Sequence, residues 1–468
     1  MNDLVIIQTS QGLAKYVEQH FGQEVARSRG VLIGFDARHN SSRFAERAAV
    51  SFLQLGIPVY LFSDIVPTPF IPFGIKCLQA VAGITVTASH NPKEDNGYKV
   101  FFENGAQIVS PHDKHIQNLI LQNLQPWPQA WQTIDLLPAA ACEATGMGVR
   151  DPLDQVSREY YSQIRKRILD PELIARTDIK FTFTALHGVG HKYMSAAFAA
   201  CSFPSYHPVP EQMLPDPEFP TVKFPNPEEG KGVLDLSIRT ANSTGSQVIL
   251  ANDPDADRCA LAERQEDGSW KLFNGNEIGA LLGWWLWLLH RKASADGKDS
   301  DCYMLSSAVS SKILHSISRK EGFNFIETLT GFKWMGNRAN ELLEQGKKVI
   351  FAFEEAIGFM CGPTVLDKDG ITAGIEIAQM AAYVREVHAS SLTDHLKFIF
   401  HQYGYHTSLN SYFICHEKAV IDGIFKRLAN YAGSSNTYPQ MIGPYRVSRV
   451  RDLHHAFDSG IEGNVPVS

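Results

Sequence analysis

Residues 85 to 99 read Thr85-Val-Thr-Ala-Ser-His-Asn-Pro-Lys-Glu-Asp-Asn-Gly-Tyr-Lys99, the most informative stretch of the chain. The apolar, β-branched run at residues 81–87 has the length of a buried strand, and Pro92 prevents its simple continuation. Ser89 therefore follows a predicted strand beside the imidazole of His90, where its hydroxyl could carry a phosphoryl group. The alternative is a serine that only bonds the backbone of its own turn.

A second acidic motif follows another predicted strand. The apolar run at residues 247–251 leads into Asn252-Asp-Pro-Asp-Ala-Asp-Arg258. Three carboxylates spaced two residues apart repel one another unless a cation lies between them, and oxygen ligands at this density suit Mg²⁺ or Ca²⁺. An EF-hand loop is excluded, because its sixth and twelfth positions are Arg258 and Arg264 here. A solvated acidic turn remains the alternative to a metal site that also handles an anion.

The composition is that of an ordinary globular protein. The 468 residues predict about three domains, and 44% of them are hydrophobic and 20% charged. A net charge of −7 gives no reason to expect nucleic acid or an anionic membrane as a partner. The longest apolar stretch, residues 278–289, is too short to span a bilayer and predicts a buried helix. Seven scattered cysteines without a Cys-x-x-Cys pair and the absence of a signal-peptide pattern predict a cytoplasmic protein.

Strand-like and helical patterns alternate along the chain, which predicts an α/β fold with mostly parallel sheets. The strands are expected at residues 31–35, 58–62, 81–87, 180–186, 247–251, 303–305 and 349–353, with a helix over 43–55. Polar residues follow four of these strands, namely Asp36 with Arg38, Ser89, Asp253 and Glu354. Ligands of open α/β sheets bind at the carboxyl ends of strands, so these residues predict a shared cleft.

Three other segments bear on the domain organisation. Eight of the 24 prolines fall within residues 203–230, which predicts a long ordered loop. Residues 125–147 are irregular and are expected to link two units, and residues 399–405 are expected to precede a short final unit.

Further motifs lie later in the chain. Gly331-Phe-Lys-Trp334 is expected in a loop, and Asp367-Lys-Asp-Gly370 in a turn. The carboxylates of Phe353-Glu-Glu-Ala-Ile-Gly358 could hold sugar hydroxyls, although acids at a helix N-terminus are the competing interpretation. His187-Gly-Val-Gly-His191 lacks a third nearby metal ligand, and the chain has no ATP-binding P-loop motif.

In combination, these motifs resemble those of the α-D-phosphohexomutase superfamily, and within it the animal-type branch with phosphopentomutase and phosphoglucomutase activity. The resemblance rests on the ordered motifs beginning at Thr87, Asp253, Thr330 and Glu354 and extends along essentially the whole chain. It implies four α/β domains, with mixed, mostly parallel sheets, around a central cleft. The implied domains are a phosphoserine domain at 1–150, a metal-binding domain at 151–298, a sugar-binding domain at 299–398 and a C-terminal phosphate-binding domain at 399–468.

The resemblance also implies roles for individual residues. Ser89 would be the phosphoserine, and one Mg²⁺ would bind Asp253, Asp255, Asp257 and a phosphoserine oxygen. The implied catalytic residues are Ser89, His90, Lys99, Arg258 and Lys368, of which His90, Lys99 and Lys368 are candidates for the general base. The implied substrate-binding residues are Asp36, Arg38, Thr330, Gly331, Lys333, Glu354 and Ala356.

The implied reaction interconverts ribose or deoxyribose 1- and 5-phosphates, and glucose 1- and 6-phosphates, through a sugar bisphosphate that also serves as activator. Phosphosugars are the expected partners of a monomeric, cytoplasmic enzyme that binds neither nucleic acid nor membrane. A glucose-1,6-bisphosphate synthase is the alternative enzyme, but that branch carries arginine and serine where this chain has Pro92 and Ala356.

A non-catalytic form is the other alternative, because two loops of the family are not found. The family's opening Gly-Thr-(Ala/Ser)-Gly-Leu-Arg and closing Arg-Thr-Ser-Gly-Thr-Glu-Pro motifs do not occur in the chain. On the family's pattern, the first domain is expected to lack its opening strand and loop, and the fourth domain to be incomplete.

Overall fold

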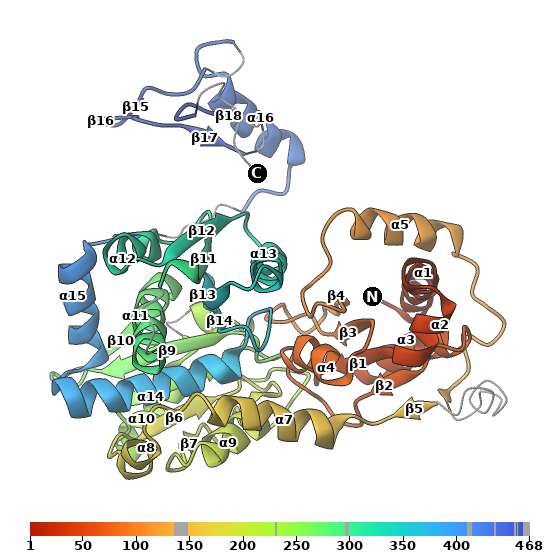
Figure 1. Ribbon diagram of the computed structural model, residues 1–468, viewed down its shortest axis with the longest axis horizontal. Helices are drawn as coiled ribbons and strands as arrows, with labels where there is room; N and C mark the ends of the chain where they lie inside the picture. Colours follow the sequence, from red (N-terminus) through yellow and green to blue (C-terminus); the bar gives the residue numbers. More distant parts are fainter. Residues whose placement is uncertain are drawn as a thin grey trace. The chain divides into compact units, whose positions relative to one another are not determined.

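The computed structural model describes residues 1–134, 148–229, 232–294, 299–409, 414–434, 437–453, 455 and 457–461. These residues form two compact units, Met1–His406 and Thr407–Ser468. The first unit contains three sheets with helices packed on them (Figure 1). Most of the predicted linker at 125–147 lies outside the described residues.

The first sheet carries the Ser89 loop. Its strand order is β4-β3-β1-β2-β5, and every pair is parallel except the antiparallel pair of β3 and β4. The strands are β1 (Val31–Phe35), β2 (Val59–Leu61), β3 (Ala82–Val86), β4 (Lys99–Phe102) and β5 (Val149–Arg150). The helices of this part are α1 (Asp3–Phe21), α2 (Gln23–Arg29), α3 (Ser41–Leu53), α4 (Phe70–Leu78) and α5 (His112–Gln122).

Both faces of this sheet are covered. Along β1, Val31 and Ile33 pack into one apolar cluster with residues of α1 and α3, whereas Leu32 packs into another with α4 and α7 (Leu153–Arg165). Side chains of a strand alternate between its faces, so a strand apolar at every position must be covered on both sides. All five residues of β1 are buried accordingly.

The second sheet carries the Asp253 loop and has the order β10-β9-β8-β6-β7. Its central strand β8 pairs in parallel with β6 and antiparallel with β9, so the Asp253 loop is the connection of a hairpin. The strands are β6 (Phe181–Thr184), β7 (His207–Pro208), β8 (Val248–Asn252), β9 (Cys259–Arg264) and β10 (Trp270–Phe273). The helices are α8 (Pro171–Arg176), α9 (Gly190–Ala200), α10 (Asp235–Thr244) and a 3-10 turn at Pro227–Glu229.

The third sheet has the order β12-β11-β13-β14 and is parallel except for the β13–β14 hairpin. Its strands are β11 (Cys302–Ser307), β12 (Asn324–Thr328), β13 (Lys348–Glu354) and β14 (Gly358–Cys361). The helices are α11 (Gly275–Ala293), α12 (Ile313–Glu321), α13 (Phe332–Glu344), α14 (Gly370–His388) and α15 (Leu392–Tyr403), preceded by a 3-10 turn at Asp299–Asp301.

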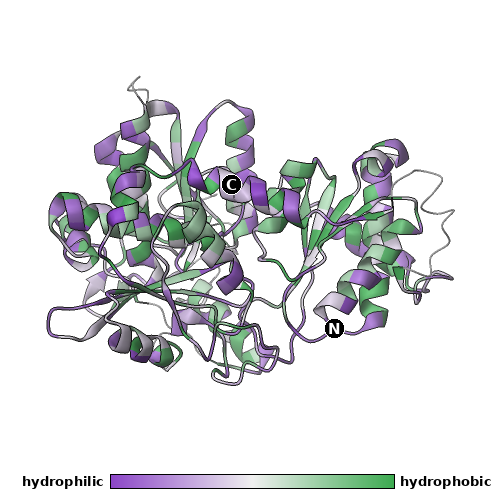
Figure 2. Cartoon of the chain, turned by 90° about the horizontal axis from the view of Figure 1, so that it is seen from below, coloured by the Kyte–Doolittle hydropathy of each residue, from purple (hydrophilic) through white to green (hydrophobic). Residues whose placement is uncertain are grey.

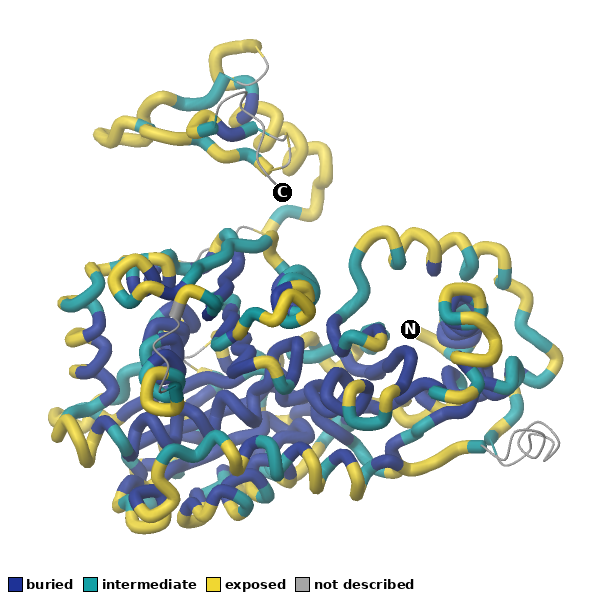
Figure 3. Tube along the Cα trace, viewed as in Figure 1, coloured by how far each residue is buried: buried dark blue, intermediate teal, exposed yellow. Residues whose placement is uncertain are grey.

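Helix α14 joins the second and third sheets. Its residues 370–382 are buried without exception, and the helix contacts α9, β9 and β14. Figure 3 shows its dark blue trace, and in Figure 2 the strands are mainly green whereas the surrounding helices carry both colours. A buried carboxylate, Glu376, is held there by Arg167 Nε at 2.6 Å and Trp285 Nε1 at 2.9 Å.

The second unit contains one helix and two short hairpins among its described residues. These are α16 (Lys418–Ala429), β15 (Met441–Ile442) with β16 (Tyr445–Arg446), and β17 (Arg451–Asp452) with β18 (Phe457–Asp458). Most of its trace is coloured as exposed in Figure 3. The large apolar side chains of α16 are exposed, namely Val420, Ile421, Ile424, Phe425 and Leu428.

The predicted α/β class with mixed, mostly parallel sheets is confirmed. All seven predicted strands and the buried helix at 278–289 are present. The first compact unit ends at His406, next to the boundary expected at residues 399–405, and α15 continues to Tyr403. Within the described ranges, no helix is both long enough and apolar enough to cross a membrane.

Candidate active site

Ser89 lies in a tight turn after β3, in a conformation that its neighbours hold in place. Its φ angle is +52°, in the left-handed region that is unusual for residues other than glycine. The Thr87 hydroxyl accepts a hydrogen bond from the Ser89 amide at 2.9 Å and donates one to buried Asp36 at 2.6 Å. The Ser89 hydroxyl in turn donates to Asp253 Oδ2 at 3.0 Å, so the first and second sheets meet at this serine.

Close packing explains why position 97, in the Asn-Gly-Tyr segment after Ser89, is a glycine. A Cβ atom at this position would lie 2.3 Å from the carbonyl oxygen of Thr87, well inside van der Waals contact. The close approach lets the Thr87 amide donate to the Gly97 carbonyl at 3.2 Å and so closes the Ser89 loop on itself.

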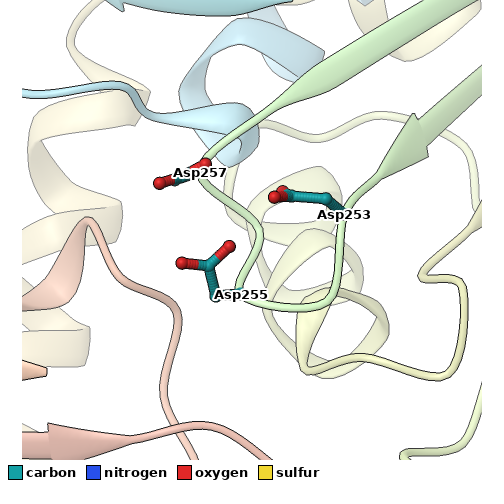
Figure 4. A group of neighbouring side chains, drawn as sticks. All are labelled: Asp253, Asp255 and Asp257. Atoms are coloured by element: carbon teal, nitrogen blue, oxygen red, sulfur yellow. The ribbon is translucent and has the colours of Figure 1, made fainter. Parts of the chain in front are cut away.

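The three aspartates of the second motif face one another on one loop (Figure 4). Ligand oxygens of Asp253, Asp255 and Asp257 lie within 4.8 Å of one another, and all three side chains are buried. The structure therefore brings together the predicted ligand set, which a solvated acidic turn would not do. Ala256, at the turn, has a φ of +54° and turns the chain so that its flanking aspartates converge.

Two lysines balance this negative charge. Lys99, at the start of β4, lies 2.8 Å from Asp255 Oδ2 and 2.9 Å from Asp257 Oδ2. Lys368, before α14, lies 3.5 Å from Asp257 Oδ2 and 3.3 Å from Asp367 Oδ1. Burial works against both ammonium groups, but the facing aspartates outweigh it and raise the pKa of each lysine. Both lysines are therefore cationic at neutral pH in this arrangement.

The carboxylates differ in their affinity for a proton. Burial, together with the charges of Asp255 and Asp257, raises the pKa of Asp253 well above its usual range. Burial also acts on Asp255, but the charge and hydrogen bond of Lys99 and the Thr68 hydroxyl at 2.6 Å lower its pKa. Asp253 is therefore the carboxylate of the three that binds a proton most readily, and a cation bound at this position would replace that proton.

The donor set fits a hard divalent ion. Asp255 Oδ1 and Asp257 Oδ1 are buried and have no hydrogen-bond partner within the part of the chain that the structure describes. Buried carboxylate oxygens are normally paired, and carboxylates are the ligands that Mg²⁺ and Ca²⁺ prefer. This buried triad could therefore bind a metal ion.

His90 and Arg258 lie at the rim of this group. The His90 Nδ1 atom is 3.3 Å from Ser89 Oγ, and burial, with the charge of Arg258, lowers the pKa of His90 to about 4. The imidazole is therefore neutral at pH 7. Arg258 donates to the Ala356 carbonyl at 3.2 Å and lies 3.7 Å from Glu228, so it reaches the third sheet.

The third sheet adds a carboxylate, Glu354, at the end of β13. Its Oε1 accepts a hydrogen bond from the Gly331 amide at 2.6 Å, which joins two predicted sugar-binding motifs. Burial raises the pKa of Glu354, with the charge of Lys368 acting in the opposite direction. Of the neighbouring predicted residues, Lys333 lies over the Trp334 ring at 5.4 Å, and Thr330 is exposed.

The predicted cleft residues are not all arranged as expected. Asp36 and Arg38 follow a strand at the predicted edge of the sheet. However, both are buried beneath the Ser89 loop, where Arg38 donates hydrogen bonds to backbone carbonyls. The motif at 187–191 has a packing role: Gly188 and Val189 lie against Pro254, and the Val189 amide donates to the Pro254 carbonyl at 2.9 Å.

Sequence reasoning missed Thr68, whereas Glu355 belongs to the predicted motif at residues 353–358. Thr68 donates its hydroxyl to Asp255 and its amide to the Asp255 carbonyl at 2.9 Å, and so ties the first sheet to the Asp253 loop. Glu355 receives hydrogen bonds from Ser310 at 3.0 Å and Ser307 at 3.3 Å and fixes the loop beside Glu354. A threonine in a Thr-Pro loop carries no local signal for this contact.

The chain that carries this site matches three domain descriptions of one family. Phosphoglucomutase/phosphomannomutase α/β/α domain I matches residues 1–126, domain II residues 158–268 and domain III residues 274–403. The chain belongs to the phosphoglucomutase/phosphomannomutase family. Membership confirms the superfamily and the isomerase class predicted from the sequence.

Similar proteins of this family have names that describe mutases or a related synthase. The chain is 51% identical over 467 residues to "Phosphopentomutase" of Homo sapiens, covering 98% of this chain and 74% of that protein. It is 47% identical over 470 residues to "Glucose 1,6-bisphosphate synthase" of Homo sapiens, covering 98% and 73%. It is 38% identical over 477 residues to "Phosphoribomutase" of Saccharomyces cerevisiae, covering 100% and 76%.

Solved structures of the family share the fold. A phosphoglucomutase/phosphomannomutase family protein from Burkholderia thailandensis superimposes with a TM-score of 0.64 at 18% identity, covering 85% of this chain and 76% of that one. A phosphoglucomutase, parafusin, from Paramecium gives a TM-score of 0.63 at 20% identity, covering 85% and 71%. These likenesses support the fold alone.

Proposed function

We propose that this chain is a phosphosugar mutase that carries its phosphoryl group on Ser89 and acts on pentose 1-phosphates and glucose 1-phosphate. The observation that carries the proposal is the contact of Ser89 Oγ with Asp253 Oδ2 at 3.0 Å, at the edge of a buried carboxylate triad. A serine used only to close its own turn has no need of that neighbour. The names of the similar proteins supply the substrate class.

The chemistry divides between Ser89 and the sugar hydroxyl. The hydroxyl oxygen of the sugar attacks the phosphorus on Ser89, a new P–O bond forms, the bond to Ser89 Oγ breaks, and the hydroxyl proton goes to a base. The resulting bisphosphate turns over in the cleft and returns its other phosphoryl group to Ser89. Such a transfer needs positioning and charge stabilisation more than covalent chemistry.

Phosphorylated Ser89 carries about −1.5 to −2 charge beside three aspartates. Mg²⁺ is the proposed metal, which when bound by Asp253, Asp255, Asp257 and a phosphoserine oxygen supplies electrostatic stabilisation of the transferred phosphoryl group.

Arg258, Lys99 and Lys368 are proposed to stabilise charge on the phosphoryl oxygens. The pKa directions separate the three candidate bases. Lys99 and Lys368 stay protonated beside the aspartates, whereas burial keeps His90 neutral at pH 7. His90 is therefore the proposed acceptor of the hydroxyl proton, 3.3 Å from Ser89 Oγ. The two lysines are suited to binding charged oxygens.

The sugar is proposed to lie between the first and third sheets. Glu354 would accept hydrogen bonds from sugar hydroxyls, with Thr330, Gly331, Lys333 and Ala356 beside it. Ala356 offers no hydroxyl to a sugar, which fits the pentose substrates of the relatives named phosphopentomutase. A soluble sugar bisphosphate is proposed to prime Ser89 by phosphorylating it.

The test is turnover of the purified chain on ribose 1-phosphate and on glucose 1-phosphate with Mg²⁺ and glucose 1,6-bisphosphate. We expect isomerised product from wild type, none from Ser89→Ala, and a phosphate on Ser89 by mass spectrometry. Mutase activity that survives Ser89→Ala would refute the mechanism.

The same assays distinguish the mutase from the alternative enzyme, a glucose-1,6-bisphosphate synthase. Relatives named glucose 1,6-bisphosphate synthase are 47% identical to this chain, only a few per cent below the phosphopentomutases. If 1,3-bisphosphoglycerate as phosphoryl donor gives steady bisphosphate without isomerised sugar, the synthase becomes the better assignment.

A further inference from the structure

The proline-rich segment at residues 203–229 touches the Ser89 loop in the first sheet, although it belongs to the second. Its Phe219 is 5% exposed, has a φ of +46° and places its ring 5.0 Å from the guanidinium carbon of Arg38. The preceding Glu218 bonds both His39 and Lys93 at 2.6 Å. None of these contacts takes part in the proposed phosphoryl transfer.

Arg38 is the centre of the Ser89 loop. Its terminal nitrogens donate to the carbonyl oxygens of Asn91 at 2.6 Å, Ser89 and Pro92 at 2.7 Å, and Asp95 at 3.3 Å. Its Nε lies 3.3 Å from Asp36, and the residue is 4% exposed. The terminal nitrogens of this buried guanidinium have their acceptors in the Ser89 loop, so the loop is built around one side chain.

The same segment is also tied to the loop of the aspartates, at a residue two positions after Phe219. Thr221 bonds His187 Nε2 through its hydroxyl at 2.7 Å. The adjacent Gly188 packs directly on Pro254, where a Cβ atom would come within 2.2 Å of the Pro254 Cα. Phe219 therefore contacts Arg38, which holds the Ser89 loop. Thr221 contacts His187, whose neighbour Gly188 packs on the Asp253 loop.

We propose that Phe219 is a positioning residue, which presses Arg38 onto the carbonyls of the Ser89 loop and so fixes Ser89 against the aspartates. The aromatic face stabilises the guanidinium and excludes water that would compete for its donors. Arg38 accordingly acts on the backbone rather than on the sugar. The positioning role itself does not depend on the proposed function. Only its expected effect on the rate of turnover rests on that function.

The test compares Phe219→Leu with Phe224→Leu. Phe224 lies on the same segment, is 49% exposed and has the Lys223 ammonium 5.7 Å from its ring, so it is the control phenylalanine whose cation contact is not Arg38. The first readout is hydrogen–deuterium exchange of residues 88–97. Exchange there is expected to rise at least tenfold in Phe219→Leu and to stay at the wild-type rate in Phe224→Leu.

The second readout is kinetic. Misplacement of a reacting group by about 1 Å lowers rates by up to ~10²-fold, so we expect kcat to fall at least tenfold with KM changed less than threefold. Arg38→Lys should reproduce this split, because a lysine cannot bridge four carbonyls. Its melting temperature and that of Phe219→Leu report any general loss of folding.

The two readouts separate the two proposals. Unchanged exchange at residues 88–97 in a folded Phe219→Leu protein would overturn the positioning role. Raised exchange in a protein whose wild type shows no mutase activity would overturn only the proposed function. If Phe219→Leu fails to fold, Phe219→Tyr, which keeps the ring face, should leave exchange and kcat at wild-type values, and altered values would count against the proposal.

Discussion

Gly188→Ala tests whether the loop of the three aspartates is held by its packing. A Cβ atom on Gly188 would lie 2.2 Å from the Pro254 Cα and 2.3 Å from the Pro254 carbonyl oxygen. Ordinary contacts begin near 3.4 Å, so the two backbones must separate by roughly 1 Å, at an overpacking cost of about 1–3 kcal/mol. The loop begins one residue before Pro254, so Asp253 must move with it.

Such a movement should be visible in metal binding before it is visible in folding. Mg²⁺ requires near-ideal ligand positions, and disturbing the support of metal ligands typically lowers affinity by about 10–100-fold. We expect Gly188→Ala to need at least ten times more Mg²⁺ for half of the Mg²⁺-dependent rise in melting temperature. The measurement is a melting curve at increasing Mg²⁺ concentration, with Ca²⁺ as a second ion.

Gly190→Ala is the control, since its new Cβ would meet only side-chain atoms, at 3.2 Å from Asn252 Oδ1 and 3.4 Å from Phe183 Cζ. It should bind Mg²⁺ within threefold of wild type. Wild-type Mg²⁺ dependence in folded Gly188→Ala would refute the reasoning, because the loop would then tolerate the displacement without losing its ligand geometry.

Three further perturbations have defined outcomes. Lys99→Met removes the ammonium from between two buried carboxylates, so Mg²⁺ should raise the melting temperature of the variant more than that of wild type; an equal rise would contradict this. Burial, with the charge of a neighbouring histidine, lowers the pKa of His395 to about 4 against about 6.5 in an unfolded chain. The unfolded state therefore binds the proton more tightly, and stability falls as the pH drops from 6.5 to 4. His395→Gln should show a shallower fall in melting temperature over that range than wild type or His401→Gln, and parallel curves would exclude this role. Tyr160 donates to buried Asp369 at 2.8 Å, so Tyr160→Phe should lose about 1–3 kcal/mol in urea unfolding, and a loss below 0.5 kcal/mol would mean that another donor replaces it.

The sequence predicted the site where the chemistry is local. Asp253, Asp255 and Asp257 are spaced so that a single turn brings them together, and the strand before them was recognisable from its apolar run. Strands with weaker patterns were missed, among them β9, which starts only two residues after Asp257, and the two-residue strands β5 and β7. The hairpin character of the Asp253 loop could therefore not be read from the pattern.

Asp36 and Arg38 show where the strand-end rule stops. The rule places a residue at the edge of a sheet but does not say whether its side chain faces a cleft or supports the neighbouring loop. Here the neighbouring loop has carbonyl oxygens that turn inward, and the guanidinium satisfies them. The sequence around position 38 does not predict those hydrogen bonds, because the carbonyls belong to residues 89–95.

The same distinction explains why the proline-rich segment gave only a loop prediction. Its prolines restrict the backbone, but its role depends on the contacts it makes in the structure. Phe219 contacts Arg38, and Thr221 contacts His187. Phosphoryl transfer depends on holding two loops from different sheets at one distance, and an ordered segment in contact with both supports is a physical means to do so. Residues whose chemistry depends on a local motif can thus be predicted from the sequence. Residues that set the distance between two loops can be identified only from the structure.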